Sequence, residues 1–152
     1  MYSDNDIKII KGDEHVVQNQ DKYFGTKGAN PESICSGIAQ GAMILGCEHT
    51  EISKCGNWWL VSGDIDWLKQ PNQLHVYETE VFESLIAFPE AGDNWFRSEY
   101  LASVFSSVLV TFDGNSSKIV KGNESNLIEF NRLASNLKSK QRIVGFVFAK
   151  SI

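Results

Sequence analysis

The segment 31–46, PESICSGIAQGAMILG, constrains the fold of this chain more than any other stretch. It carries no charge after the glutamate in its first turn. Its opening proline suits the start of a helix, and its closing glycine suits the residue just past the end. The pattern therefore predicts one buried helix over 31–46, on which the remaining elements must pack. Its apolar residues recur at helical spacing: Ile34, Ile38, Ala42 and Leu45.

Two features indicate what packs against this helix. Gly37 and Gly41 leave a bare strip along it, where a β-sheet could approach closely. The segment 142–149 near the end of the chain is, after its first residue Arg142, apolar at both odd and even positions. A strand that is apolar on both faces is buried on both faces, so 142–149 is predicted to be a central strand.

Shorter segments supply the other elements. Segments 48–54 and 58–63 are expected to form a hairpin around Gly56 and Asn57. We predict a single α+β domain over 7–152, built as a two-layer sandwich of a mixed β-sheet with helices on one face. Other strands are expected at 74–79, 108–112 and 118–120, and other helices at 81–88, 98–106 and 125–137, the last one capped by Ser125.

The net charge of the chain limits its partners. At −5, the chain as a whole would not attract a nucleic acid, and it is better suited to a basic protein surface. No apolar run is long enough for a membrane span, and the N-terminus lacks the pattern of a signal peptide. The 3 cysteines are an odd number, which favours reduced thiols. We therefore expect a cytoplasmic protein that binds neither nucleic acid directly nor membrane.

Several short motifs stand in a familiar order. IKIIKG at 7–12 and YFG at 23–25 precede the long helix, which ends at Gly46, and VFESLIAFPEAG follows at 81–92. This order resembles the ATPase domain of the DNA gyrase B and topoisomerase IV families, a GHKL domain. There an arm segment and a MYIG turn precede the nucleotide-site helix, and a VVMTxLHAGG segment precedes the ATP lid. The resemblance covers most of the chain through short matches and implies a gyrase-B-like fold.

The residues that this resemblance would require for ATP hydrolysis are replaced. In the family, the nucleotide-site helix carries a catalytic Glu and, four residues later, an Asn that binds magnesium. Aligning Gly46 with the family's terminal glycine places Ile34 and Ile38 at those positions. Isoleucine supplies neither a general base nor an oxygen ligand for magnesium. The resemblance therefore implies a degenerate ATPase fold without the activity.

The loops around the implied nucleotide site also depart from the family. Its Asp-x-Gly-x-Gly motif, whose Asp receives the adenine amino group, should fall near 62–71, but the glycines after that Asp are missing, and Trp67 follows Asp66 directly. The phosphate lid should fall at 93–99, which contains no glycine. We interpret the remains as a vestigial nucleotide pocket and expect no cofactor. Its residues would be Ile34, Ile38, and Asp64 or Asp66.

A zinc site is the other chemistry that the sequence raises. Cys35, Cys47, His49 and Cys55 have a spacing that matches no usual zinc motif. Cys35 would also lie inside the core helix. Ordinary thiols are therefore favoured, and no metal is expected. The scattered histidines favour surface or hydrogen-bonded roles over a general base.

Acidic residues gather in the middle of the chain, where two interpretations stay open. One is a solvated face. The other is a binding patch for a basic protein, with large aromatic side chains as its anchors. This second interpretation assigns protein binding to Trp67, Glu90, Asp93, Trp95 and Phe96.

Residues 1–6 are predicted to form a flexible arm. In the family that the chain resembles, the arm reaches across a dimer, and a Tyr in it contacts the partner's nucleotide. Tyr2 could keep such an exchange without nucleotide, which would give a homodimer through the arm.

Three functions remain open from the sequence. The leading one is a non-catalytic protein-interaction module that modulates or mimics a type II topoisomerase, with a topoisomerase subunit as its partner. The second is an immunity or antitoxin-type protein that neutralises a basic toxin. The third is residual nucleotide binding, which the missing Glu and Asn disfavour.

Overall fold

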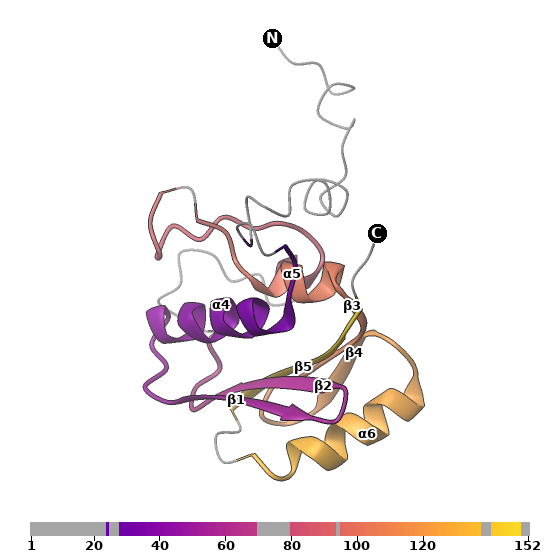
Figure 1. The fold of residues 1–152 in the computed structure, drawn as a ribbon. Coiled ribbons are helices and arrows are strands. Elements are labelled where there is room, and N and C mark those ends of the chain that lie inside the picture. The colour runs from indigo at the N-terminus through magenta and orange to yellow at the C-terminus, as the bar shows by residue number, and fades with distance from the viewer. Residues whose placement is uncertain (1–23, 25–27, 70–79, 94, 138–140, 150–152) are drawn as a thin grey trace.

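The computed structural model describes residues 24, 28–69, 80–93, 95–137 and 141–149, and its centre is a five-stranded sheet. The strand order is β1-β2-β5-β3-β4 (Figure 1). Every pairing among the described residues is antiparallel, so the predicted mixed sheet is wrong, whereas the α+β class is confirmed. The strands are β1 (Thr50–Cys55), β2 (Trp58–Gly63), β3 (Ser106–Phe112), β4 (Ser117–Lys121) and β5 (Arg142–Phe148).

The antiparallel pattern follows from two hairpins and the strand between them. β1 and β2 pair around the predicted turn, where Gly56 has a φ of 61°. β3 and β4 form the second hairpin, and β5 enters between β2 and β3, antiparallel to both. β5 is therefore the central strand, as its apolar sequence predicts.

The described α-helices are α4 (Pro31–Ile44), α5 (Glu99–Val104) and α6 (Glu124–Ala134). α4 confirms the predicted core helix, and Asn30 caps it by accepting a hydrogen bond from the Ser33 amide at 2.8 Å. α6 is capped by Asn123 rather than by the predicted Ser125, because Asn123 and Asn126 form a reciprocal capping box. None of the described helices could span a bilayer.

The predicted helix over 81–88 is wrong. Only a short 3₁₀ helix, η2 (Glu80–Phe82), forms at its start. Beyond it the chain is extended, because Phe88 donates its amide to the Trp95 carbonyl and Arg97 donates to the Ile86 carbonyl, both at 2.8 Å. The predicted strand 74–79, the 7–12 motif and the 1–6 arm with Tyr2 lie outside the described residues.

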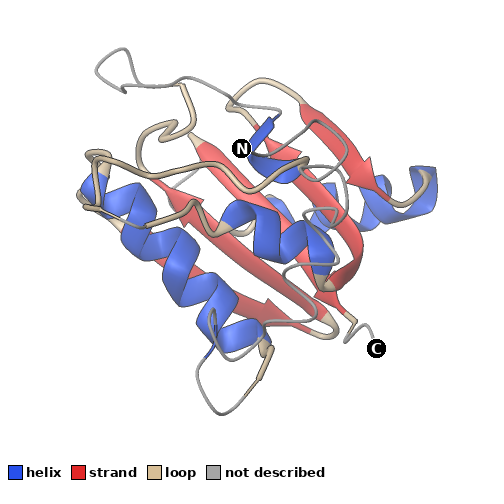
Figure 2. Cartoon of the chain, turned by 90° about the horizontal axis from the view of Figure 1, so that it is seen from above, coloured by secondary structure: helices blue, strands red, loops and turns tan. Residues whose placement is uncertain are grey.

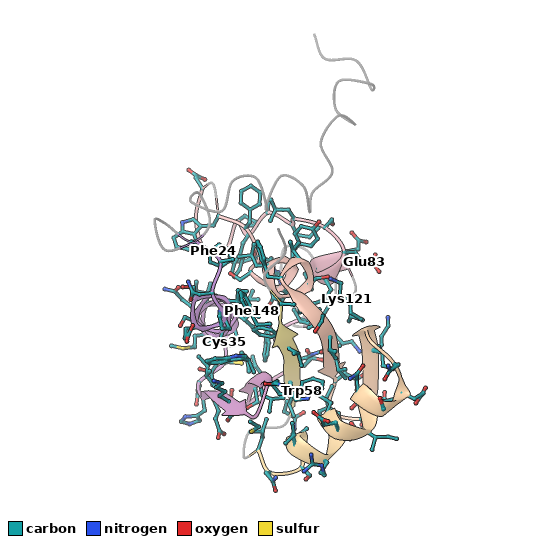
Figure 3. The ribbon with its side chains drawn as sticks, turned by 45° about the vertical axis from the view of Figure 1, so that its right-hand side comes forward. Phe24, Cys35, Trp58, Glu83, Lys121 and Phe148 are labelled. Atoms are coloured by element: carbon teal, nitrogen blue, oxygen red, sulfur yellow. The ribbon has the colours of Figure 1, made fainter. Side chains whose placement is uncertain are left out.

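Helices cover both faces of the sheet, so the prediction of helices on one face is wrong for α6. α4 and α5 pack on one face, and α6 packs on the other (Figures 1 and 2). Alternate residues of β5 serve the two cores: Val144 and Phe146 face α4, whereas Ile143 faces α6. The two cores can be located by Cys35 of α4, which lies in the core under α4, and Trp58 of β2, which lies in the core under α6 (Figure 3).

The glycines of α4 are contacted by other elements than the predicted sheet. A Cβ at Gly37 would lie 2.5 Å from the Ser98 hydroxyl oxygen, and one at Gly41 would lie 3.1 Å from the Phe88 ring. Ser98 precedes α5, and Phe88 belongs to the extended segment after η2. The strip of α4 that has no side chains at Gly37 and Gly41 is therefore packed against the start of α5 and against the extended segment that contains Phe88.

Candidate functional site

The floor of the implied nucleotide pocket is hydrophobic core. Ile34 and Ile38 project from α4 into the cluster that contains Val61, Val144 and Phe146, and both are 0% exposed. Their burial confirms α4 as the core helix. At these two positions the resemblance would require a Glu and an Asn, so the inward face of α4 lacks both polar groups.

Asp66, one of the two acidic residues that could belong to the implied pocket, forms an ion pair with a buried arginine. The Arg142 Nε donates to Asp66 Oδ1 and its Nη2 to Oδ2, both at 2.8 Å. Arg142 is 0% exposed, and its Nη1 donates to the Thr111 hydroxyl at 3.0 Å. A bidentate guanidinium engages both carboxylate oxygens, so an amino group of a ligand would have to compete with Arg142 for Asp66. Asp64 lies apart from this pair and accepts the Glu48 amide at 3.2 Å.

Trp67 lies in the core, so its predicted role as a surface anchor is wrong. The side chain is 0% exposed, and its Nε1 donates to Glu99 Oε2 at 2.9 Å. The ring lies against Gly63, where an added Cβ would be 2.9 Å from it. Glu99 is itself buried, and this desolvation raises the pKa of its carboxyl group above the ordinary value, against the lowering effect of the Trp67 hydrogen bond.

The raised pKa of Glu99 makes stability depend on pH. The unfolded chain releases this proton near pH 4.5, whereas the folded chain retains it to higher pH. Between the two pKa values the folded state binds more protons, so the free energy of unfolding should fall as pH rises. Glu99→Gln keeps an acceptor for Trp67 and removes the titration. Urea unfolding from pH 4.5 upward should show stability declining in the parent relative to the variant, and a constant difference would contradict this assignment.

Among the described residues, two aromatic side chains are exposed at the surface. Trp95 is 52% exposed and Phe96 is 36% exposed, and Asp93 beside them is also exposed. We name these three residues the aromatic surface. The backbone of Trp95 and Phe96 is held by pairing, because Phe88 donates to the Trp95 carbonyl and Ala87 forms an antiparallel bridge with Phe96.

Glu90 supports the aromatic surface from within. Its Oε2 lies 3.9 Å from Nη2 of Arg97, which is 3% exposed and stacks 4.9 Å from the Phe88 ring centroid. Phe88 in turn packs against Gly41 of α4. The side chain of Glu90 is 16% exposed, so it offers a partner less surface than Trp95 does.

The cysteines do not gather into a metal site in the described part of the chain. Burial raises the pKa of the Cys35 thiol to about 12 and that of the Cys47 thiol to about 11, which keeps both protonated at neutral pH. The structure instead brings together Glu48, His49 and Asp64, one ligand atom from each lying within 4.8 Å of the others. The sequence alone does not reveal this set, because the three residues do not form a short motif. The antiparallel pairing of β1 with β2 places Asp64 beside His49.

Comparisons of the chain with protein-family models, with curated proteins and with solved structures found no match.

Proposed function

We propose that this chain is a non-catalytic protein-interaction module that binds its partner through the aromatic surface. The observation that carries the proposal is Trp95, whose side chain is 52% exposed while its carbonyl is held by Phe88 at 2.8 Å. An aromatic side chain on an ordered backbone loses little conformational entropy on binding. Tryptophan is also enriched among the residues that dominate interface energies.

The absence of catalysis is part of the proposal. Its support is the closed interior face of α4, where Ile34 and Ile38 are 0% exposed, together with the bidentate pairing of Asp66. We also propose that the α+β architecture is a degenerate gyrase-B-like GHKL fold. The order of a core helix, a hairpin, a second helix and a second hairpin supports it.

The partner that fits this surface is a protein with basic residues around an apolar pocket. The chain has a net charge of −5, and Asp93 is exposed beside Trp95. Arg97 follows closely, but it is 3% exposed and lies beside Glu90, so it does not offset Asp93 at the surface. We propose a type II topoisomerase subunit as this partner; a basic toxin neutralised by the chain has the same surface chemistry and is the alternative outcome of the test.

The test is capture of the partner from the native host, followed by kinetics with the purified partner. Trp95→Ala should weaken binding by about 2 kcal/mol, mainly through faster dissociation, because it removes an apolar anchor. Asp93→Lys should mainly slow association and reduce its dependence on salt. Mass spectrometry identifies the captured protein as a topoisomerase subunit, a basic toxin or neither.

Ile128→Ala is the matched control, because Ile128 is 69% exposed and lies on α6 at the opposite face of the sheet. It should leave the affinity unchanged. A folded Trp95→Ala, Phe96→Ala variant with parental affinity would refute the aromatic surface as the binding site.

A further inference from the structure

We propose that Glu48, His49 and Asp64 form a binding site for a divalent transition-metal ion such as Zn²⁺. Glu48 and His49 stand in the turn between α4 and β1, and Asp64 follows β2. One ligand atom from each lies within 4.8 Å of the others. The residues therefore come from two segments that meet at one end of the β1–β2 hairpin (Figure 1).

The backbone holds these two segments in register. The Glu48 amide donates to Asp64 Oδ1 at 3.2 Å, and the Asp64 amide donates to the His49 carbonyl at 3.2 Å. Thr50 pairs with Gly63 in the adjoining rung of the sheet. The Cα positions of the three residues are thus fixed by the hairpin, and their converging side chains do not depend on a flexible loop.

The side chains can adjust to an ion without moving the backbone. Zn²⁺ binds nitrogen and oxygen at about 2.0–2.1 Å, so ligand atoms around it lie about 3.4 Å apart. Glu48 and His49 are exposed and Asp64 is half-buried, so rotation of their side chains can close the remaining gap. Within the described residues, neither the Glu48 nor the Asp64 carboxylate has a Lys or Arg partner, so two negative charges converge there without a cation.

The ligand set selects the class of ion. An imidazole with two carboxylates suits Zn²⁺ and its transition-metal neighbours, whereas Mg²⁺ and Ca²⁺ prefer oxygen ligands alone. Three protein ligands leave at least one position for water. Because the ion would join the turn before β1 to the residue after β2, its binding should also stabilise this end of the hairpin.

The experiment is a Zn²⁺ titration of the full chain, freed of tags and stripped of metal. Calorimetry should give one ion per chain with a Kd of about micromolar. NMR of the histidine rings should show Zn²⁺ perturbing His49. His49→Ala and Asp64→Asn should each weaken binding at least about tenfold; asparagine retains the oxygen that accepts the Glu48 amide, so the hairpin should stay folded.

Two matched histidine variants, His15→Ala and His75→Ala, should bind Zn²⁺ as the parent does. Mg²⁺ at the same concentration should not compete. Affinity weaker than millimolar, or binding that survives His49→Ala, would overturn the proposed site. Loss of binding in His15→Ala or His75→Ala with His49→Ala unaffected would place the ion elsewhere and would overturn it equally.

Discussion

The variant Ile38→Asp is expected to accumulate as unfolded chain. Ile38 is 0% exposed and packs between α4 and the sheet. An uncompensated buried carboxylate costs several kcal/mol, comparable to the total stability of about 5–15 kcal/mol for a domain. Circular dichroism should show loss of cooperative thermal unfolding, and the amide NMR spectrum should collapse to random-coil dispersion.

Met43→Asp is the matched control for this variant. Met43 belongs to the same helix, but its side chain is 54% exposed. The new carboxylate there stays hydrated, so only the helix propensity and an unfavourable interaction with the C-terminal end of the helix dipole change, at a combined cost of about 1 kcal/mol. A folded Ile38→Asp protein, or equal losses in both variants, would contradict the packing of α4 against the sheet.

Asp66→Asn is expected to lower the free energy of unfolding by about 3–5 kcal/mol. The substitution keeps the shape of the side chain but removes the charge that faces the Arg142 guanidinium, which is 0% exposed. A buried cation that has lost its carboxylate carries most of its desolvation cost. Chemical denaturation of the two proteins measures the loss.

A second variant tests whether the stability lost in Asp66→Asn comes from the unpaired charge of Arg142. Asp66→Asn combined with Arg142→Met removes both charges, so it should be more stable than Asp66→Asn alone. Asp113→Asn provides the surface control: Asp113 lies 3.8 Å from the exposed Lys69, and asparagine keeps the oxygen that accepts the Asn115 and Ser116 amides, so the loss should be less than about 1 kcal/mol. If the loss of stability in the double variant equalled the sum of the losses in Asp66→Asn and in Arg142→Met, each measured alone, the two charges would not interact.

The Asp66–Arg142 pair also bears on the proposed degenerate ATPase fold. The resemblance places Asp66 or Asp64 where an adenine amino group would bind, and in the structure an arginine from β5 engages Asp66 instead. Because Arg142 stands 76 residues after Asp66, no local pattern in the sequence could pair them. This pair supports the proposal that the site serves no nucleotide.

Where local chemistry decides, the sequence predicts the structure well. α4, the β1–β2 hairpin and the central strand β5 follow from apolar periodicity, a proline at the helix start and a Gly-Asn turn, all of which act over a few residues. Prediction failed at 81–88, where periodicity favoured a helix but the backbone pairs with Trp95 and Arg97 instead.

The sequence by itself determined the α+β class, the core helix, the β1–β2 hairpin and the central position of β5. Only the tertiary structure decided which aromatic residues reach the surface: Trp67 and Trp95 are both tryptophans after an acidic or polar residue, yet one is 0% and the other 52% exposed. Trp67 finds room against Gly63, four residues before it, but the partner for its indole is Glu99, which long-range packing brings to it from 32 residues away. The same holds for Glu48, His49 and Asp64, because strand register places residues together that are distant in sequence.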